Sequence, residues 1–294
     1  MTTLNIDSEF NAQLLAEWYE GIGVDEVIAD EPVNRLKPLA DSMGDVVSAA
    51  QNQVANLEGA QPQFQSSEPL RFTPPRTKAD DTPPLGTAEA VSDALRIAKE
   101  CKTLDELYTA ITEFDGCMLK RLAQNPAIHD GNAKARIMLL GEVASSDDDK
   151  TGKPFSGAAG QLLDKMFDAI GLNRGAEAVE KSLYISHMVP WRPPGNRMVS
   201  DSDISICRPF VMRHIELVKP DVLVLLGGVT TKAVLKTSKG ITRMRGRFTE
   251  LDLDDGSAVK TLPMLHPAFL MTSPDRKKEA WQDLMMLKDS LGMS

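Results

Sequence analysis

Four short apolar runs alternate with amphipathic helical patterns along the last two thirds of the 294-residue chain. The runs cover residues 137–140, 182–189, 221–226 and 261–265. Runs of this length, in which polar residues do not alternate with apolar ones, are typical of strands that are buried on both faces. Because helical patterns separate the strands, we predict a three-layer α/β/α sandwich with a short, mainly parallel four-stranded sheet.

The densest pattern of the sequence follows the first apolar run. Glu142 ends that run, an acidic loop over residues 145–149 comes next, and a helix is expected over residues 158–170. Between loop and helix, three glycines flank Phe155, so that backbone and ring can approach a flat ligand without Cβ atoms in the way. These glycines are Gly152, Gly157 and Gly160. A strand, a glycine-rich loop and a helix start form an anion-receptive turn, which serves nucleotides, sugars and DNA phosphates alike.

The chain divides into three parts by composition. Residues 1–58 carry helical patterns and are expected to form a helical N-terminal segment. Residues 59–86 are rich in Pro, Ser, Gln and Thr, which predicts a disordered Pro-rich linker. Residues 87–294 form the predicted α/β domain. The N-terminal segment is either a tethered interaction element or a helical hairpin packed on that domain.

The net charge of −9 is unevenly distributed. Residues 134–294 carry 23 Lys and Arg against 20 Asp and Glu, whereas residues 1–133 carry 10 against 22. The acidity therefore belongs to the front of the chain and does not exclude nucleic-acid binding by the rest. The three cysteines are far apart and form no CxxC pair, which favours reduced thiols. The sequence has no apolar run long enough to cross a bilayer and starts without a secretory signal, so we expect a cytoplasmic protein that does not bind membranes.

Polar residues follow the predicted strands at their carboxyl ends, where parallel sheets bind ligands. The four ends carry Glu142, His187, Gly227 and His266. Arginines occupy the neighbouring loops, where they are either available to phosphates or merely solvated. They are Arg192, Arg197, Arg243, Arg245 and Arg247. The sequence thus predicts a site at this edge of the sheet.

Several motifs in order resemble the uracil-DNA glycosylase superfamily, and most closely its family 4. They are GE followed by DD, PF and AG-x-LL, then PWRPPGNR, a strand ending in LLGG, RMRG, and HPA. The resemblance covers about residues 115–292 and is specific because the motifs occur in the correct order.

The resemblance implies that a damaged base is flipped out of DNA and cut from its sugar at the N-glycosidic bond. Three catalytic residues follow from it: Glu142, Asp148 acting on water, and His266 donating to the O2 atom of the leaving base. Phe155, His187 and Val143 would bind the base. The residues expected to contact DNA are Arg192, Asn196, Arg197 and Arg245. Met271 or Leu270 would enter the minor groove.

The sequence departs from the family pattern of the active site at two places. The family's GEAPG is GEVAS here, with Val143, Ala144 and Ser145 narrowing the sugar side of the pocket. His187 replaces the asparagine that reads uracil, and imidazole cannot donate and accept on one edge as an amide does. This substitution predicts a different base, relaxed discrimination or lost activity.

Many family 4 members hold a four-iron cluster through four cysteines. Only Cys117 and Cys207 match those positions here, and Lys120 and Trp191 occupy the other two. Because two thiolates cannot hold a cubane cluster in the usual way, we expect no iron–sulfur cluster and no other metal or cofactor.

These patterns support one leading hypothesis and two rivals. The leading one is a DNA glycosylase of base-excision repair with altered or weakened uracil specificity. It is expected to be monofunctional, without lyase activity, because no strand end carries a lysine for a Schiff base. The second is a catalytically silent protein that binds DNA or senses lesions, and the third an enzyme acting on a nucleotide or nucleoside. We expect a monomer whose N-terminal segment recruits a repair or replication partner, or shields the basic face from nonspecific DNA.

Overall fold

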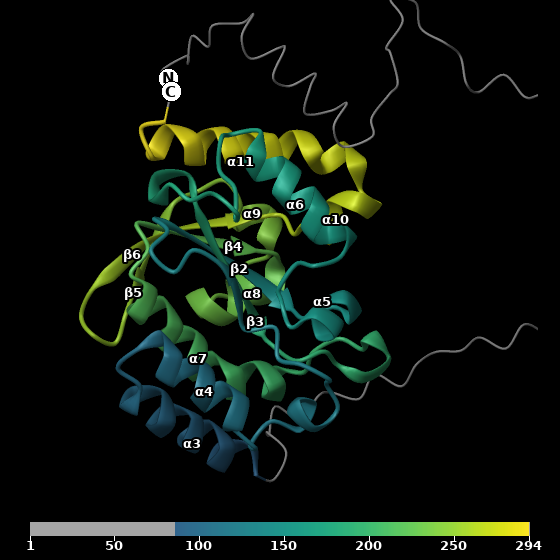
Figure 1. The fold of residues 1–294 in the computed structure, drawn as a ribbon. Coiled ribbons are helices and arrows are strands. Elements are labelled where there is room, and N and C mark those ends of the chain that lie inside the picture. Colours follow the sequence, from purple (N-terminus) through teal and green to yellow (C-terminus); the bar gives the residue numbers. More distant parts are fainter. Residues whose placement is uncertain (1–85, 294) are drawn as a thin grey trace, which may run out of the picture. The chain divides into compact units, whose positions relative to one another are not determined.

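The computed structural model describes residues 86–293, which contain a six-stranded sheet in the order β1-β3-β2-β4-β6-β5 (Figure 1). Four central strands are mutually parallel, and an antiparallel strand borders them on each side. Their bounds are β1 His129–Gly131, β2 Ile137–Val143, β3 Leu183–Val189, β4 Val222–Leu226, β5 Thr249–Asp252 and β6 Ala258–Met264. The predicted α/β class and the four parallel strands are confirmed, but the predicted number of strands was too low by two.

The two additional strands are short and border the sheet. β1 has the sequence HDG and β5 the sequence TELD, and both are largely polar and partly exposed. An edge strand is covered on fewer sides than a central one, so it needs no apolar run. The hydrophobic pattern that identifies the central strands is therefore absent from these two segments.

Helices cover both faces of the sheet, which gives the predicted three layers (Figure 1). One layer contains α6 Ala158–Asp168, α10 Pro267–Thr272 and α11 Lys277–Ser290, and the other contains α3 Thr87–Glu100, α4 Leu104–Glu113, α7 Asp201–Val218 and α8 Gly228–Leu235. A separate apolar cluster fills the space on each side of the sheet. Strand residues alternate between the clusters, as in Met138 and Leu139, because successive side chains of a strand point to opposite faces.

Short elements complete the described chain. α5 Ser146–Thr151 follows β2, and α9 Ile241–Met244 follows α8. Single 3₁₀ turns cover Met118–Arg121, Val179–Lys181, Pro194–Asn196 and Pro274–Arg276. Residues 145–149, expected as an acidic loop, instead begin a helix, because Ser145 and Asp148 form a reciprocal capping box.

The expected helical segment (residues 1–58) and residues 59–85 of the expected linker lie outside the described residues. Within residues 86–293, the structure has no helix with the length and apolarity needed to cross a membrane.

Candidate active site

The carboxyl ends of β2, β3 and β6 border a cavity of about 420 Å³. The six residues predicted for catalysis and base binding all line it: Glu142, Val143, Asp148, Phe155, His187 and His266. They come from sequence segments up to 124 positions apart, and the parallel strands bring them together at one edge. The backbone of α6 forms another wall through Gly157 and Gly160.

Phe155 lies at the centre of this group in a strained backbone conformation. Its φ angle is 55°, which a residue with a side chain adopts only at a cost of about 1–3 kcal/mol. Two contacts hold it there. Arg174 donates to the carbonyl oxygens of Pro154 (3.0 Å) and Phe155 (3.4 Å). A Cβ atom on Gly160 would lie 1.7 Å from the Phe155 carbonyl oxygen, so α6 approaches this loop only because that position is glycine.

The Phe155 ring contacts both imidazoles of the site. Its centroid lies 4.7 Å from that of His187 and 5.5 Å from that of His266, and the latter pair is stacked with an interplanar angle of 28°. Gly141 allows this packing, because a Cβ atom there would lie 2.6 Å from the Phe155 ring and 2.5 Å from His187 Nδ1. Phe155 therefore fixes the positions of the two rings relative to each other.

His187 and Asp148 form a buried pair. His187 Nε2 donates to Asp148 Oδ2 across 3.1 Å, and the two side chains are 2% and 3% exposed. His187 Nδ1 is also buried and has no hydrogen-bond partner among the described residues. When the imidazole is neutral, its proton is therefore on Nε2 and its Nδ1 atom is a bare acceptor.

The carboxylate of Asp148 accepts three hydrogen bonds. Besides His187, it accepts from the backbone N–H of Ser145 (2.9 Å) and of Ser156 (2.7 Å). Burial alone would raise the pKa of Asp148, but the His187 hydrogen bond and charge and these two N–H groups outweigh burial and lower its pKa to about 2. A carboxylate with so low a pKa is a weak base at neutral pH. The geometry favours Asp148 as a positioning residue for His187 rather than the predicted activator of water.

Replacing Asp148 with asparagine is expected to lower the free energy of unfolding by about 2 kcal/mol at pH 7, because an amide N–H₂ would then face N–H donors. The pKa of Asp148 is lower in the folded protein than its ordinary value of 3.8, so its stabilisation is complete above about pH 4 and is lost as pH falls toward 2. Urea unfolding of both proteins at pH 7 and pH 3 measures this. A difference that does not shrink at pH 3 would contradict the assignment.

Glu142 lies near the end of β2 and against the start of α8. Its Oε1 atom accepts from the Val229 N–H across 2.9 Å. Burial raises the pKa of Glu142, while the N–H groups of Val229 and Gly228 and the His187 charge oppose that rise. Gly227, with a φ angle of 99°, allows the approach, since a Cβ atom there would lie 2.3 Å from Oε1. Glu142 is partly exposed and lines the cavity, so it remains available to a ligand.

His266 ends the loop after β6 and caps α10. Its Nδ1 atom accepts from the Ala268 N–H across 3.2 Å, which leaves the proton of the neutral ring on Nε2. Burial lowers the pKa of His266 to about 4, with a further lowering from His187 and an opposing effect of Asp148. The residue is therefore a neutral hydrogen-bond donor at physiological pH.

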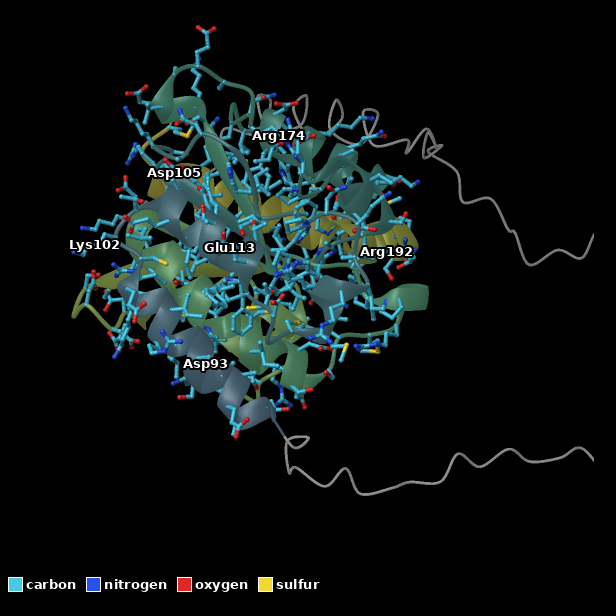
Figure 2. The ribbon with its side chains drawn as sticks, turned by 60° about the horizontal axis from the view of Figure 1, so that its bottom comes forward. Asp93, Lys102, Asp105, Glu113, Arg174 and Arg192 are labelled. Atoms are coloured by element: carbon cyan, nitrogen blue, oxygen red, sulfur yellow. The ribbon has the colours of Figure 1, made fainter. Side chains whose placement is uncertain are left out.

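The predicted DNA contacts have different surroundings. Arg197 lines the cavity and pairs with Asp203 at 3.1 Å, while its side chain remains 45% exposed. Arg192 follows β3 in the proline-rich loop, and Figure 2 labels it at the side of the molecule. The Asn196 side chain lies outside what the structure describes.

Arg245 requires a correction. Its guanidinium forms ion pairs with Asp283 (2.5 Å) and Glu279 (3.4 Å) of α11, and its side chain is only 14% exposed. It therefore fastens the loop after α9 to α11, and we do not retain it as a DNA contact.

The sequence analysis did not single out two residues at or beside the cavity. Arg174, which supports the Phe155 loop, also pairs with Asp130 at 3.1 Å and Asp164 at 2.8 Å, and its position in a turn gave no signal. Asp147 lines the cavity with a 52% exposed carboxylate, whereas its neighbour Asp148 is buried. The alternation of exposed and buried positions on α5 would have distinguished the two, but only if the helix had been expected.

The four positions where many family members have cluster cysteines do not fit an iron–sulfur cluster here. Cys117 and Cys207 are buried thiols that interact with each other. Lys120 pairs with Asp115 at 2.7 Å, and the Trp191 indole is 2% exposed. An ammonium and an indole cannot ligate iron, so two of the four ligands are lacking.

Comparison with known proteins identifies the class that this fold and site define. The model of the uracil DNA glycosylase superfamily matches residues 128–285. The match covers more than half of the chain, and the chain belongs to this superfamily.

The similar proteins support the resemblance to family 4. The type-4 uracil-DNA glycosylase of Saccharolobus solfataricus is 31% identical over 193 residues, which are 64% of this chain and 86% of that protein. Those of Archaeoglobus fulgidus and Thermotoga maritima are 30% and 32% identical, over 65% and 58% of this chain and 94% and 85% of their own lengths. The chain therefore spans most of each relative and has about 100 further residues, most of which precede the matched region.

Proposed function

We propose that this protein is a DNA glycosylase that hydrolyses the N-glycosidic bond of uracil, or of a related deaminated base, in DNA. The observation that carries the proposal is the neutral His266 donor, which shares a cavity with Phe155 and Glu142. The type-4 glycosylases to which the chain is similar support the same reaction.

Each residue of the cavity has a role in the proposed reaction. The flipped base enters beside Phe155, whose ring is fixed by its strained backbone and by both imidazoles. As the bond to the sugar lengthens, negative charge develops on the base, and the Nε2–H of His266 donates to the O2 atom. The carboxylate of Glu142 stabilises the positive charge on the sugar or orients the attacking water. No proton needs to be lost by His266 during this step.

His187 alters how the base is read. Asp148 engages its Nε2 atom, and its Nδ1 atom is buried against Gly141, so the ring cannot pair with the edge of a base as an amide would. It offers no donor to a carbonyl oxygen of the base. We infer that the site discriminates less between uracil and related deaminated bases than a site with an amide at this position would.

Single-turnover base release tests the proposal. Labelled oligonucleotides that contain uracil, hypoxanthine or xanthine, as single strands and opposite each base, are incubated with wild-type protein and with Glu142→Gln. Release by the wild type that the variant loses supports the reaction. Retained DNA binding without release of any base would instead favour the silent DNA-binding protein.

The proposal includes three further properties of the protein. It acts as a cytoplasmic monomer, it carries no iron–sulfur cluster, and its N-terminal segment recruits a repair partner. The unsuitable ligand positions Lys120 and Trp191 support the second property. Iron determination on protein purified without oxygen tests the absence of a cluster, and a stoichiometry of four iron atoms would refute it.

Deleting residues 1–86 tests the role of the N-terminal segment. Unchanged DNA affinity, solubility and partner capture would refute that role.

A further inference from the structure

A second cavity, of about 730 Å³, lies beside α9 and is lined by positive side chains. Its lining includes Arg245, which Asp283 and Glu279 neutralise, and three further cations, Lys239, Arg243 and Arg247. Met244 and Phe248 form its apolar part. All three cations are exposed, and within residues 86–293 no carboxylate pairs with them. The base-binding site described above uses none of these residues.

The surrounding segment contains cations without any counter-charge. Six Lys and Arg residues fall between Asp221 and Glu250, and no Asp or Glu does. Arg245 differs from the other five because it has carboxylate partners outside the segment. Asp283 and Glu279 neutralise it and fix the segment to α11. The neighbouring Arg243 and Arg247 are thus held on a fixed backbone with their charges unneutralised.

This segment is attached to the edge of the sheet that carries the proposed active site. The Gly246 N–H donates to the Pro263 carbonyl oxygen across 3.2 Å, and His266 follows three residues later. At the other end, Ile241 lies near Gly228, since a Cβ atom on that glycine would be 3.8 Å from the Ile241 side chain. Gly228 precedes Val229, whose N–H binds Glu142. Arg192 and Arg197 lie in the loop after β3, near the opposite end of the row of parallel strands.

We propose that the cavity beside α9 is a second DNA site, which binds the phosphodiester backbone of the duplex that flanks the flipped base. This second proposal rests on the proposed function only for the flipped base; binding of duplex DNA at the cavity does not require it. The lining consists of cations, two threonines, Met244 and Phe248, and it contains no carboxylate or amide side chain that could read a base edge through paired donors and acceptors. Binding there is independent of sequence and depends on salt through the release of counterions.

The test is the salt dependence of affinity for an undamaged 24-base-pair duplex, which requires no glycosylase activity. The full-length triple variant Lys239→Gln, Arg243→Gln and Arg247→Gln is compared with wild type. We expect affinity to fall by about 10- to 100-fold near 0.1 M salt, and the slope of log affinity against log salt to decrease by about three, or about one for each cation removed.

A matched control removes three exposed lysines elsewhere. Lys99 and Lys102 belong to the layer of α3 and α4, and Lys134 precedes β2 at the amino edge of the sheet. Figure 2 shows Lys102 on the side of the view opposite to Arg192. Glutamine at these three positions should leave the slope within about one of wild type.

Three results would overturn the proposal. One is an unchanged slope in the first variant while its thermal midpoint equals that of wild type. Another is an equal loss in both variants, because the effect would then reflect only net charge. The third is binding of millimolar inorganic phosphate to the wild type that the triple variant loses while its affinity for duplex is unchanged, which would mark a site for a small anion. Failure of base release by the wild type would affect the proposed function and leave this result standing.

Discussion

Replacing His266 with alanine is expected to slow single-turnover uracil release by about 10²–10³-fold, the loss found when one donor to a developing oxyanion is removed. The reason is that His266 is neutral, with its proton on Nε2 and its Nδ1 bound to the Ala268 N–H. Because its pKa is about 4, the rate should not change through titration of His266 between pH 5 and pH 8. The measurement is the first-order rate of strand breakage after alkali treatment.

His266→Asn is the matched control, since its amide supplies a donor and an acceptor at similar positions. It should recover part of the rate that alanine loses. If alanine and asparagine both release uracil at the wild-type rate, His266 only caps α10, and its role in the reaction would be refuted.

Replacing His187 with asparagine is expected to increase uracil release by about 10- to 100-fold and to reduce release of other bases. An amide can accept from N3–H and donate to O4 of uracil, and such a bidentate pair provides about 1–3 kcal/mol of discrimination. The present imidazole cannot form such a pair, because Asp148 engages Nε2 and Nδ1 is buried against Gly141. Parallel assays on uracil and hypoxanthine in the same sequence measure the change in preference.

His187→Ala separates base reading from simple loss of the His187–Asp148 pair. It leaves Asp148 with its two backbone donors and provides no contact to the base. If alanine and asparagine change the rates for both bases equally, His187 does not read the base. If neither substitution permits release, the bulkier Val143, Ala144 and Ser145 loop would be the residual obstacle.

The central part of the fold could be predicted because buried strands leave a clear pattern. The runs that became β2, β3, β4 and β6 are continuous and apolar, and each is fully buried over most of its length. β1 and β5 could not be predicted in this way, since edge strands of three and four residues with polar side chains have no such pattern. The helix α5 was missed because its residues are acidic, although Ser145 and Asp148 carry the capping signal.

The members of the site could be predicted, but not their charge states or partners. Strand ends and motif order brought Glu142, Phe155 and His266 to one cavity. The Asp148–His187 pair joins residues 39 positions apart, and the pair of Arg245 with Asp283 joins residues 38 apart. Residues so far apart in sequence are not neighbours on one helix or strand. Only the three-dimensional packing therefore reveals that Asp148 binds His187 and that Asp283 neutralises Arg245.

The central claim is that this site cuts a uracil base from DNA. The most direct measurement is chromatographic detection of free uracil released from a duplex with a single U·G pair, with wild-type protein in excess and His266→Ala alongside. The claim predicts one uracil per duplex with the wild type, an intact sugar–phosphate backbone until alkali is added, and little free uracil with the variant in the same time. No free uracil from a folded wild-type protein that still binds the duplex would contradict it.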